Sequence, residues 1–196
     1  MVTIVDYGSG NLRSVQKAFE RLGTPAEITS DPTRVAAATR VVLPGVGSFA
    51  DAMRGLRGRG LVEPLVEHVR ADRSFLGICM GLQLLFETGW EGGRHDGLGV
   101  LAGDVVRLEL PPGFKVPHMG WNTASWRRAA HGADYYYFVH GYHVRPADEA
   151  VVAAVTDYGG EFCSAVACGR LLATQFHPEK SQAAGLRLLT EFLERH

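Results

Sequence analysis

The sequence predicts an α/β fold with a mostly parallel central sheet, helices on both faces and an added antiparallel portion. In the first half, short continuous apolar runs alternate with segments of helical periodicity, which is typical of parallel strands covered on both faces. From Gly97 onward, strand-like stretches punctuated by glycine and proline replace this alternation. The chain has 196 residues and no low-complexity linker, so we expect one domain over residues 1–196.

The first half of the chain is expected to form successive strand–helix units. Apolar residues at helical spacing predict helices over residues 12–22 and 61–69, and Gly23 is a natural stop for the first of them. Short stretches rich in apolar and β-branched residues predict strands at residues 2–5, 26–28, 41–43 and 75–78.

The second half is expected to be rich in hairpins. Gly169-Arg170 is a predicted turn between two strands, and apolar residues from Leu186 to Leu193 predict a closing helix. The predicted strands are residues 100–110, 122–126, 135–139, 151–156, 162–168 and 171–176.

Composition narrows the class of partner. Twenty basic against 21 acidic residues leave a net charge of −1, which provides no basic field for nucleic acid or an anionic membrane. No apolar run approaches the ~18 residues needed to span a bilayer, and the first residues do not read as a signal peptide.

Three cysteines without C-x-x-C spacing favour a reducing, cytoplasmic location. Because no His, Cys and acidic residues have zinc spacing, we expect no metal and no cofactor.

Cys79 is the candidate nucleophile. It lies between Gly77 and Gly81, directly after an apolar run and before a predicted helix. Small residues on both sides allow a tight strand–turn–helix elbow that presents the side chain, and the start of a helix favours a thiolate. The alternative is a buried structural thiol, which is our expectation for Cys163 and Cys168.

His177 is the candidate proton carrier for that thiolate. It opens the sequence His177-Pro-Glu179 after an apolar run, and the carboxylate two residues on can turn back to fix the imidazole. A Cys-His-Glu arrangement of the triad type follows. The alternative for an isolated histidine is a solvated or structural residue.

Three motifs together resemble the class I, or triad, glutamine amidotransferases: Pro44-Gly-Val-Gly47, Gly77-Ile-Cys-Met-Gly-Leu-Gln83 and Gln175-Phe-His-Pro-Glu179. Within that class, residues 6–13, 117–122 and 137–140 are similar to the glutaminase subunits of imidazole glycerol phosphate synthases. This resemblance covers essentially the whole chain. It implies that Cys79 is the nucleophile, His177 the general acid and base, and Glu179 the residue that orients His177. The implied oxyanion hole consists of backbone N–H groups of Val46 or Gly47 and of Met80.

The resemblance also implies where glutamine and a partner bind. Gln83 and Glu91 match positions that hold the amino-acid end of glutamine. Gly141 stands where the family often has serine, so it is left with a backbone contact to the substrate. The implied partner is a (β/α)8 cyclase subunit in a heterodimer, facing Asn11, Arg13, His118 and Trp121. The alternative for residues 117–122 is a plain loop with Trp121 packed in the core.

Other functions remain open at this point. A glutaminase subunit of another synthase, such as anthranilate or pyridoxal phosphate synthase, shares the Cys-His-Glu set. A non-catalytic binding module on the same fold would tolerate loss of that set, and a cysteine peptidase would need a peptide groove that nothing in the sequence indicates.

Overall fold

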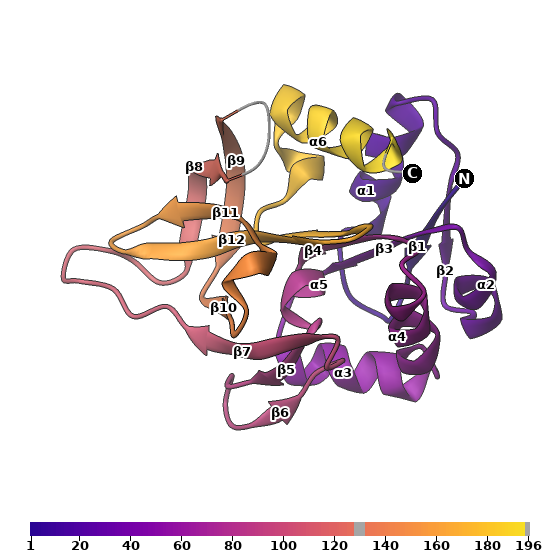
Figure 1. Cartoon of the computed structure of the whole chain (residues 1–196), viewed down its shortest axis with the longest axis horizontal. Coiled ribbons are helices and arrows are strands. Elements are labelled where there is room, and N and C mark those ends of the chain that lie inside the picture. Colours follow the sequence, from indigo (N-terminus) through magenta and orange to yellow (C-terminus); the bar gives the residue numbers. More distant parts are fainter. Residues whose placement is uncertain (128–131, 195–196) are drawn as a thin grey trace.

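The computed structural model describes residues 1–127 and 132–194. Within these residues, one mixed sheet of 13 strands runs through the middle of the molecule, with helices above and below its right-hand part (Figure 1). No helix of the described residues is long and apolar enough to cross a membrane.

The parallel part of the sheet confirms the fold expected from the first half of the chain. Its strands all run in the same direction, and each pairs with the next. In spatial order they are β2 (Ala26–Thr29), β1 (Val2–Val5), β3 (Arg40–Gly45), β4 (Ser74–Cys79) and β13 (Leu171–Thr174). Because β13 comes from the end of the chain, the sheet joins both halves of the sequence at its centre.

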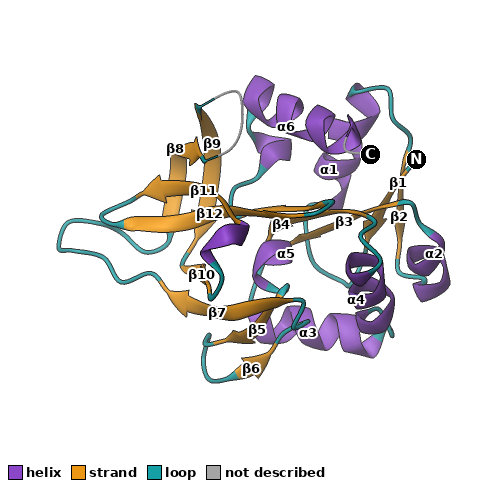
Figure 2. Cartoon of the chain, in the orientation of Figure 1, coloured by secondary structure: helices purple, strands orange, loops and turns teal. Residues whose placement is uncertain are grey.

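Helices cover both faces of this parallel part (Figure 2). One face packs against α1 (Leu12–Arg21) and α6 (Gln182–Glu194), and the other against α3 (Phe49–Gly58), α4 (Val62–Arg70) and the short α2 (Pro32–Ala37). Successive side chains of a strand point to opposite faces, so Val41 of β3 belongs to one apolar core and Val42 to the other.

The second half forms the antiparallel extension, as expected, with one exception. In spatial order the next strands are β12 (Glu161–Cys168), β10 (Tyr142–Pro146), β7 (Leu101–Arg107), β5 (Phe86–Gly89) and β6 (His95–Asp96). A branch off β12 consists of β11 (Val152–Asp157), β8 (His118–Trp126) and β9 (Ala133–His140). The exception is the pair β5–β7, which is parallel. Two 3₁₀ turns, η1 (Glu149–Val151) and η2 (Pro178–Lys180), complete the fold.

Candidate active site

Cys79 lies at the carboxyl end of β4 in the predicted elbow. Its φ of 55° and ψ of −105° place it in a region that residues with a side chain rarely adopt. Both flanking glycines are needed there, because a Cβ on Gly81 would overlap the carbonyl oxygen of Leu43, and one on Gly77 would lie 2.8 Å from the carbonyl oxygen of Gly81. The tight turn therefore forces the sulfur out of the sheet edge.

The helix after Cys79 is shorter than the sequence predicts. The apolar run after it was expected to continue a helix, but α5 spans only Met80–Gln83, and the chain then turns into β5. Leu84, Leu85 and Phe86 are all buried, and a short apolar run of this kind fits a buried strand as well as a helix. One turn of helix carries little dipole, so the expected help from a helix N-terminus to the thiolate is not available.

His177 reaches the same edge of the sheet on the neighbouring strand. Because β13 runs parallel to β4, with Thr174 opposite Ile78, the segment after β13 emerges beside Cys79. His177 Nδ1 lies 2.8 Å from Glu179 Oε1, and the two side chains are 3% and 1% exposed. The predicted histidine–carboxylate pair is therefore present and removed from water.

The electrostatics of His177 fit a proton carrier. Burial lowers the pKa of its imidazole, but hydrogen bonding and charge interaction with Cys79 and Glu179 outweigh burial and raise this pKa to about 10. The second ring nitrogen, Nε2, is buried and has no other hydrogen-bond partner. The ring therefore holds a proton at neutral pH and has one nitrogen free for the chemistry at the sulfur.

A cavity of about 360 Å³ opens at Cys79, within the usual size range of small-molecule sites. His177 and Glu179 lie outside its lining. The predicted site residues that line it are Val46, Gly47, Cys79, Met80, Gln83, Glu91 and Gly141. A larger groove of about 500 Å³ lies over β7 and β10 and contains none of these residues.

The loop after β3 forms one wall of this cavity. The carbonyl oxygen of Val46 accepts a hydrogen bond of 2.6 Å from Ser9 Oγ, and Gly47 has a φ of 97°, which favours glycine. Opposite this loop, Glu91 Oε2 accepts from the first N–H of α3, at Phe49, over 2.7 Å. Glu91 is thus held in place, with its carboxylate at the cavity.

No group of three or more His, Cys, Asp or Glu side chains within residues 1–127 and 132–194 is arranged to hold a metal ion. The three cysteines are unpaired. Burial raises the pKa of the Cys163 thiol to about 12, as expected for a core thiol. Cys168 is exposed rather than buried, because it closes β12 at the turn before β13.

Comparison with known proteins supplies the family. The model of the family described as "Glutamine amidotransferase class-I" matches residues 3–195. The chain belongs to the class I glutamine amidotransferases.

Among the relatives of this amidotransferase chain is "Imidazole glycerol phosphate synthase subunit HisH" of Rhodopirellula baltica, 60% identical, with 98% of this chain and 96% of the relative covered. The protein of the same name from Moorella thermoacetica is 50% identical, with 100% and 96% covered. A solved structure described as a glutamine amidotransferase superimposes with a TM-score of 0.79 at 23% identity, covering 99% of this chain and 98% of that one. "Structure of PurLQS from Thermotoga maritima" gives a TM-score of 0.78 at 17% identity, covering 98% and 97%.

The residues expected to face a partner of the amidotransferase divide into two groups. Trp121 is 46% exposed, with its ring edge-on to that of Tyr137, so it is not a core residue. Asn11 and Arg13 are exposed at the start of α1, where Asn11 caps the helix. His118 is only 2% exposed, and its assignment to a partner-facing surface is wrong.

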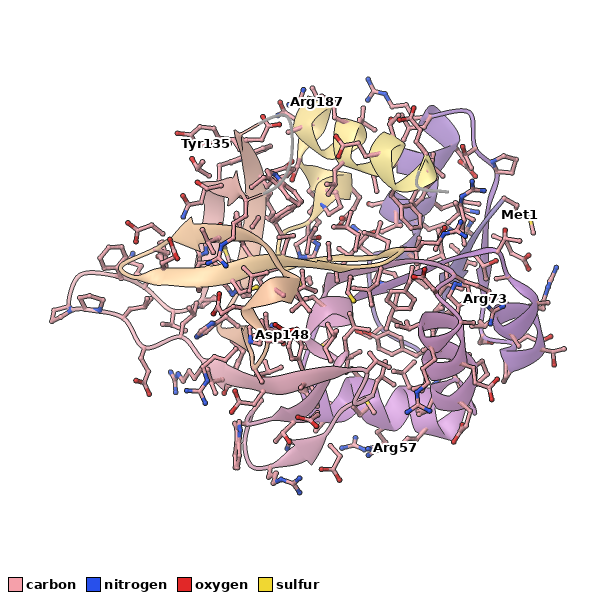
Figure 3. All side chains as sticks on the ribbon, in the orientation of Figure 1. Met1, Arg57, Arg73, Tyr135, Asp148 and Arg187 are labelled. Atoms are coloured by element: carbon pink, nitrogen blue, oxygen red, sulfur yellow. The ribbon has the colours of Figure 1, made fainter. Side chains whose placement is uncertain are left out.

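The reason for this error is that the strand predicted here starts at residue 122, whereas β8 begins at His118. Alternation along a strand sends His118 inward and Met119 and Trp121 outward. Met119 is 62% exposed, and Tyr135, at the outer end of β9, is 64% exposed and projects from the molecule (Figure 3).

Sequence reasoning missed two polar residues beside the nucleophile. Gln175 is fully buried with its Nε2 3.8 Å from Cys79 Sγ, and His140 lines the cavity. The only signal for Gln175 was its place directly before Phe176-His177, where a buried strand end would otherwise be apolar.

Proposed function

We propose that this chain is the glutaminase subunit of an imidazole glycerol phosphate synthase, and that it hydrolyses glutamine to glutamate and ammonia. The observation that carries the proposal is the buried His177–Glu179 pair next to a strained Cys79 that opens into a cavity. The relatives named as subunits of that synthase, at up to 60% identity over nearly the whole chain, support the choice of synthase.

The reaction begins at the sulfur. The Cys79 thiolate attacks the carboxamide carbon of glutamine, and the C=O electron pair moves to oxygen. His177 donates its proton to the departing nitrogen, and ammonia leaves as the C–N bond breaks, so that a γ-glutamyl thioester remains. His177 then takes a proton from water, whose oxygen attacks the thioester, and glutamate and the thiolate are released.

Two parts of the site stabilise the charge that develops. Backbone N–H groups of Met80 and of the Val46–Gly47 peptide are the donors to the oxyanion, each contributing roughly 3–4 kcal/mol of barrier lowering. Glu179 fixes the tautomer of His177 and stabilises the imidazolium without carrying the proton itself. Gln83, Glu91 and the backbone of Gly141 line the part of the cavity that takes the amino-acid end of glutamine.

Ammonia needs direct delivery, because in water at neutral pH it is mostly ammonium, which has no lone pair for attack. The proposed acceptor is a (β/α)8 cyclase subunit that forms a heterodimer with this chain and makes imidazole glycerol phosphate and an aminoimidazole carboxamide ribotide. Asn11, Arg13 and Trp121 are proposed to face it. We place this complex in the cytoplasm, where the three unpaired cysteines stay reduced, and residues 1–196 act in it as one domain.

Mixing experiments test the proposal. The purified chain is combined separately with the cyclase subunit, with an anthranilate synthase subunit and with a pyridoxal phosphate synthase subunit, and glutamate release and product formation are measured. We expect a stable complex and coupled release only with the cyclase, and none with a Cys79→Ala control. Coupling to another synthase would overturn the choice of partner, and no glutamate release in any mixture would favour a binding module.

A further inference from the structure

A set of buried amides connects Cys79 to a backbone carbonyl. Gln83 Nε2 lies 3.0 Å from the carbonyl oxygen of Tyr142 and 3.1 Å from the Oε1 of Gln175, and Gln175 Nε2 lies 3.8 Å from Cys79 Sγ. Gln83 is 3% exposed and Gln175 is fully buried.

The carbonyl of Tyr142 decides how both amides are oriented. A carbonyl only accepts, so the atom of Gln83 that faces it is the NH2 group. The second hydrogen of that group goes to Gln175, which must therefore present its oxygen to Gln83. Gln175 is left with its NH2 group facing the sulfur. Both hydrogens of Gln83 are used, so its oxygen is the group available to the cavity.

His140 contacts the same carbonyl, and His118 contacts His140 in turn. His140 Nδ1 lies 2.9 Å from the Tyr142 oxygen, and His140 Nε2 lies 3.0 Å from His118 Nδ1. Burial lowers the pKa of His118 to about 4 and that of His140 to about 3, so both rings are neutral and each carries one N–H. His140 must donate from Nδ1 and accept at Nε2, and His118 must donate from Nδ1.

Asn122, at the other end of this series of hydrogen bonds, independently fixes the direction in which His118 and His140 donate. The backbone N–H of Thr123 donates to Asn122 Oδ1 over 2.7 Å, so the other atom of this amide is the NH2 group. That group lies 2.9 Å from the carbonyl oxygen of Asp157 and 3.3 Å from His118 Nε2. It therefore donates to His118, as the neutral tautomer above requires. Backbone groups at both ends agree on one direction of hydrogen bonding.

We propose that Gln175 is a further residue of the catalytic centre, which donates an amide N–H to the Cys79 thiolate. In this proposal His118 and His140 are positioning residues. They fix the Tyr142 carbonyl and, through Gln83, the orientation of Gln175. This inference rests on the proposed role of Cys79 as nucleophile. A hydrogen bond to a charged group is stronger than one between neutral groups. Its loss is expected to reduce the reactive thiolate at neutral pH by about 10- to 100-fold.

The first test reads the ionisation of the thiol rather than turnover, so it does not depend on the synthase. Alkylation of Cys79 by iodoacetamide is followed by mass spectrometry across pH, with Cys79→Ala as the unlabelled control. Gln175→Leu keeps the size of the side chain and removes the donor, and we expect the pH midpoint of alkylation to rise by about 1–2 units. Gln16→Leu is the matched control, because Gln16 also donates to a backbone carbonyl, that of Ala26, but on α1.

An unchanged midpoint in a folded Gln175→Leu variant would overturn the role of Gln175. If the alkylation result holds but no synthase couples to glutamate release, the proposed function fails and the assignment of the thiolate donor stands.

The second test distinguishes positioning from a merely structural role. His118→Asn retains an amide N–H near the position of Nδ1, whereas His118→Gln shifts the donor towards the position of Nε2. We expect His118→Gln to raise the alkylation midpoint and His118→Asn to restore it towards that of the unmodified chain. Equal shifts in both variants would refute the role of His118.

A third measurement needs no variant that has to fold. Nitrogen-15 NMR of the unmodified chain, labelled at histidine, should show Nδ1 of both His118 and His140 protonated and both Nε2 bare. A proton on Nε2 of either ring would break the series of hydrogen bonds from Asn122 to the Tyr142 carbonyl and refute the positioning role of His118 and His140.

Discussion

Replacing Glu179 by glutamine removes a negative charge from the histidine while keeping its shape. The carboxylate lies 2.8 Å from His177 Nδ1, and neither side chain is more than 3% exposed. Coulomb's law gives roughly 6 kcal/mol for full charges at that separation with an effective dielectric constant of about 20. Because both charges are delocalised, we take about half, roughly 3 kcal/mol, which is about 100-fold in rate.

Two further features refine this expectation. If the new amide presents its NH2 group to Nδ1, the histidine is forced into the wrong tautomer, and the loss approaches about 10⁴-fold. Glu179 does not line the cavity, so the KM for glutamine should change little while kcat falls.

Steady-state glutamate release by the complex with the cyclase subunit measures both constants. Glu149→Gln is the matched control, because its carboxylate is 77% exposed and pairs with Arg127 at the surface; there we expect no loss. Thermal melting of both variants confirms that they fold. A rise in KM at unchanged kcat would assign Glu179 to substrate binding, and a loss of less than about tenfold would refute the electrostatic reasoning.

Three other perturbations are expected to have distinct effects. Cys79→Ser should abolish glutamate release but leave ammonia-dependent synthesis by the complex intact, and substantial residual glutaminase activity would remove Cys79 from its role. Trp121→Ala should weaken binding of the cyclase subunit roughly tenfold or more in a titration, with little change in the Tm of the free chain; a large drop in Tm would place Trp121 in the core instead. Burial lowers the pKa of His68 and His118 to about 4 and that of His140 to about 3. Below pH 6.5 the unfolded chain therefore binds protons that the folded chain does not, and stability is lost as the pH falls from 6.5 towards 4. At pH 5 each histidine should cost about 2 kcal/mol in urea unfolding, and constant stability between pH 7 and pH 5 would contradict this.

The parallel strands and the triad could be predicted because their signals are local. Continuous apolar runs identify buried strands, and the glycines around Cys79 leave few alternatives to a tight turn. Helix α3 was missed, although Phe49, Ala52, Met53 and Leu56 have helical spacing and are buried, because two glycines interrupt the pattern. Strand β5 was missed because its apolar run was expected to continue a helix, and β6 was missed because it has only two residues.

The surroundings of the nucleophile could not be predicted in the same way. Gln175 lies beside Cys79 only because β13 pairs with β4, and His140 meets His118 only because β8 pairs with β9, with these two residues directly opposite each other. Such contacts depend on the order and register of strands, which a single sequence does not reveal. Period-two alternation over His118–Trp121 indicates a strand, but it would place the apolar Met119 and Trp121 inside and His118 outside, the reverse of the observed burial.

The position of β13 has a consequence for how the molecule is assembled. All six residues of β4 are buried, and β13 covers one of its two edges. Until β13 (Leu171–Thr174) pairs with β4, the apolar strand β4 has an open edge. Such an edge is a template for aggregation. Closing a loop of this length is slow compared with forming local contacts, so an amino-terminal fragment that ends before β13 should aggregate rather than fold. The nucleophile gains its base only when the last strand completes the sheet, and an incomplete chain therefore carries an exposed edge but no working triad.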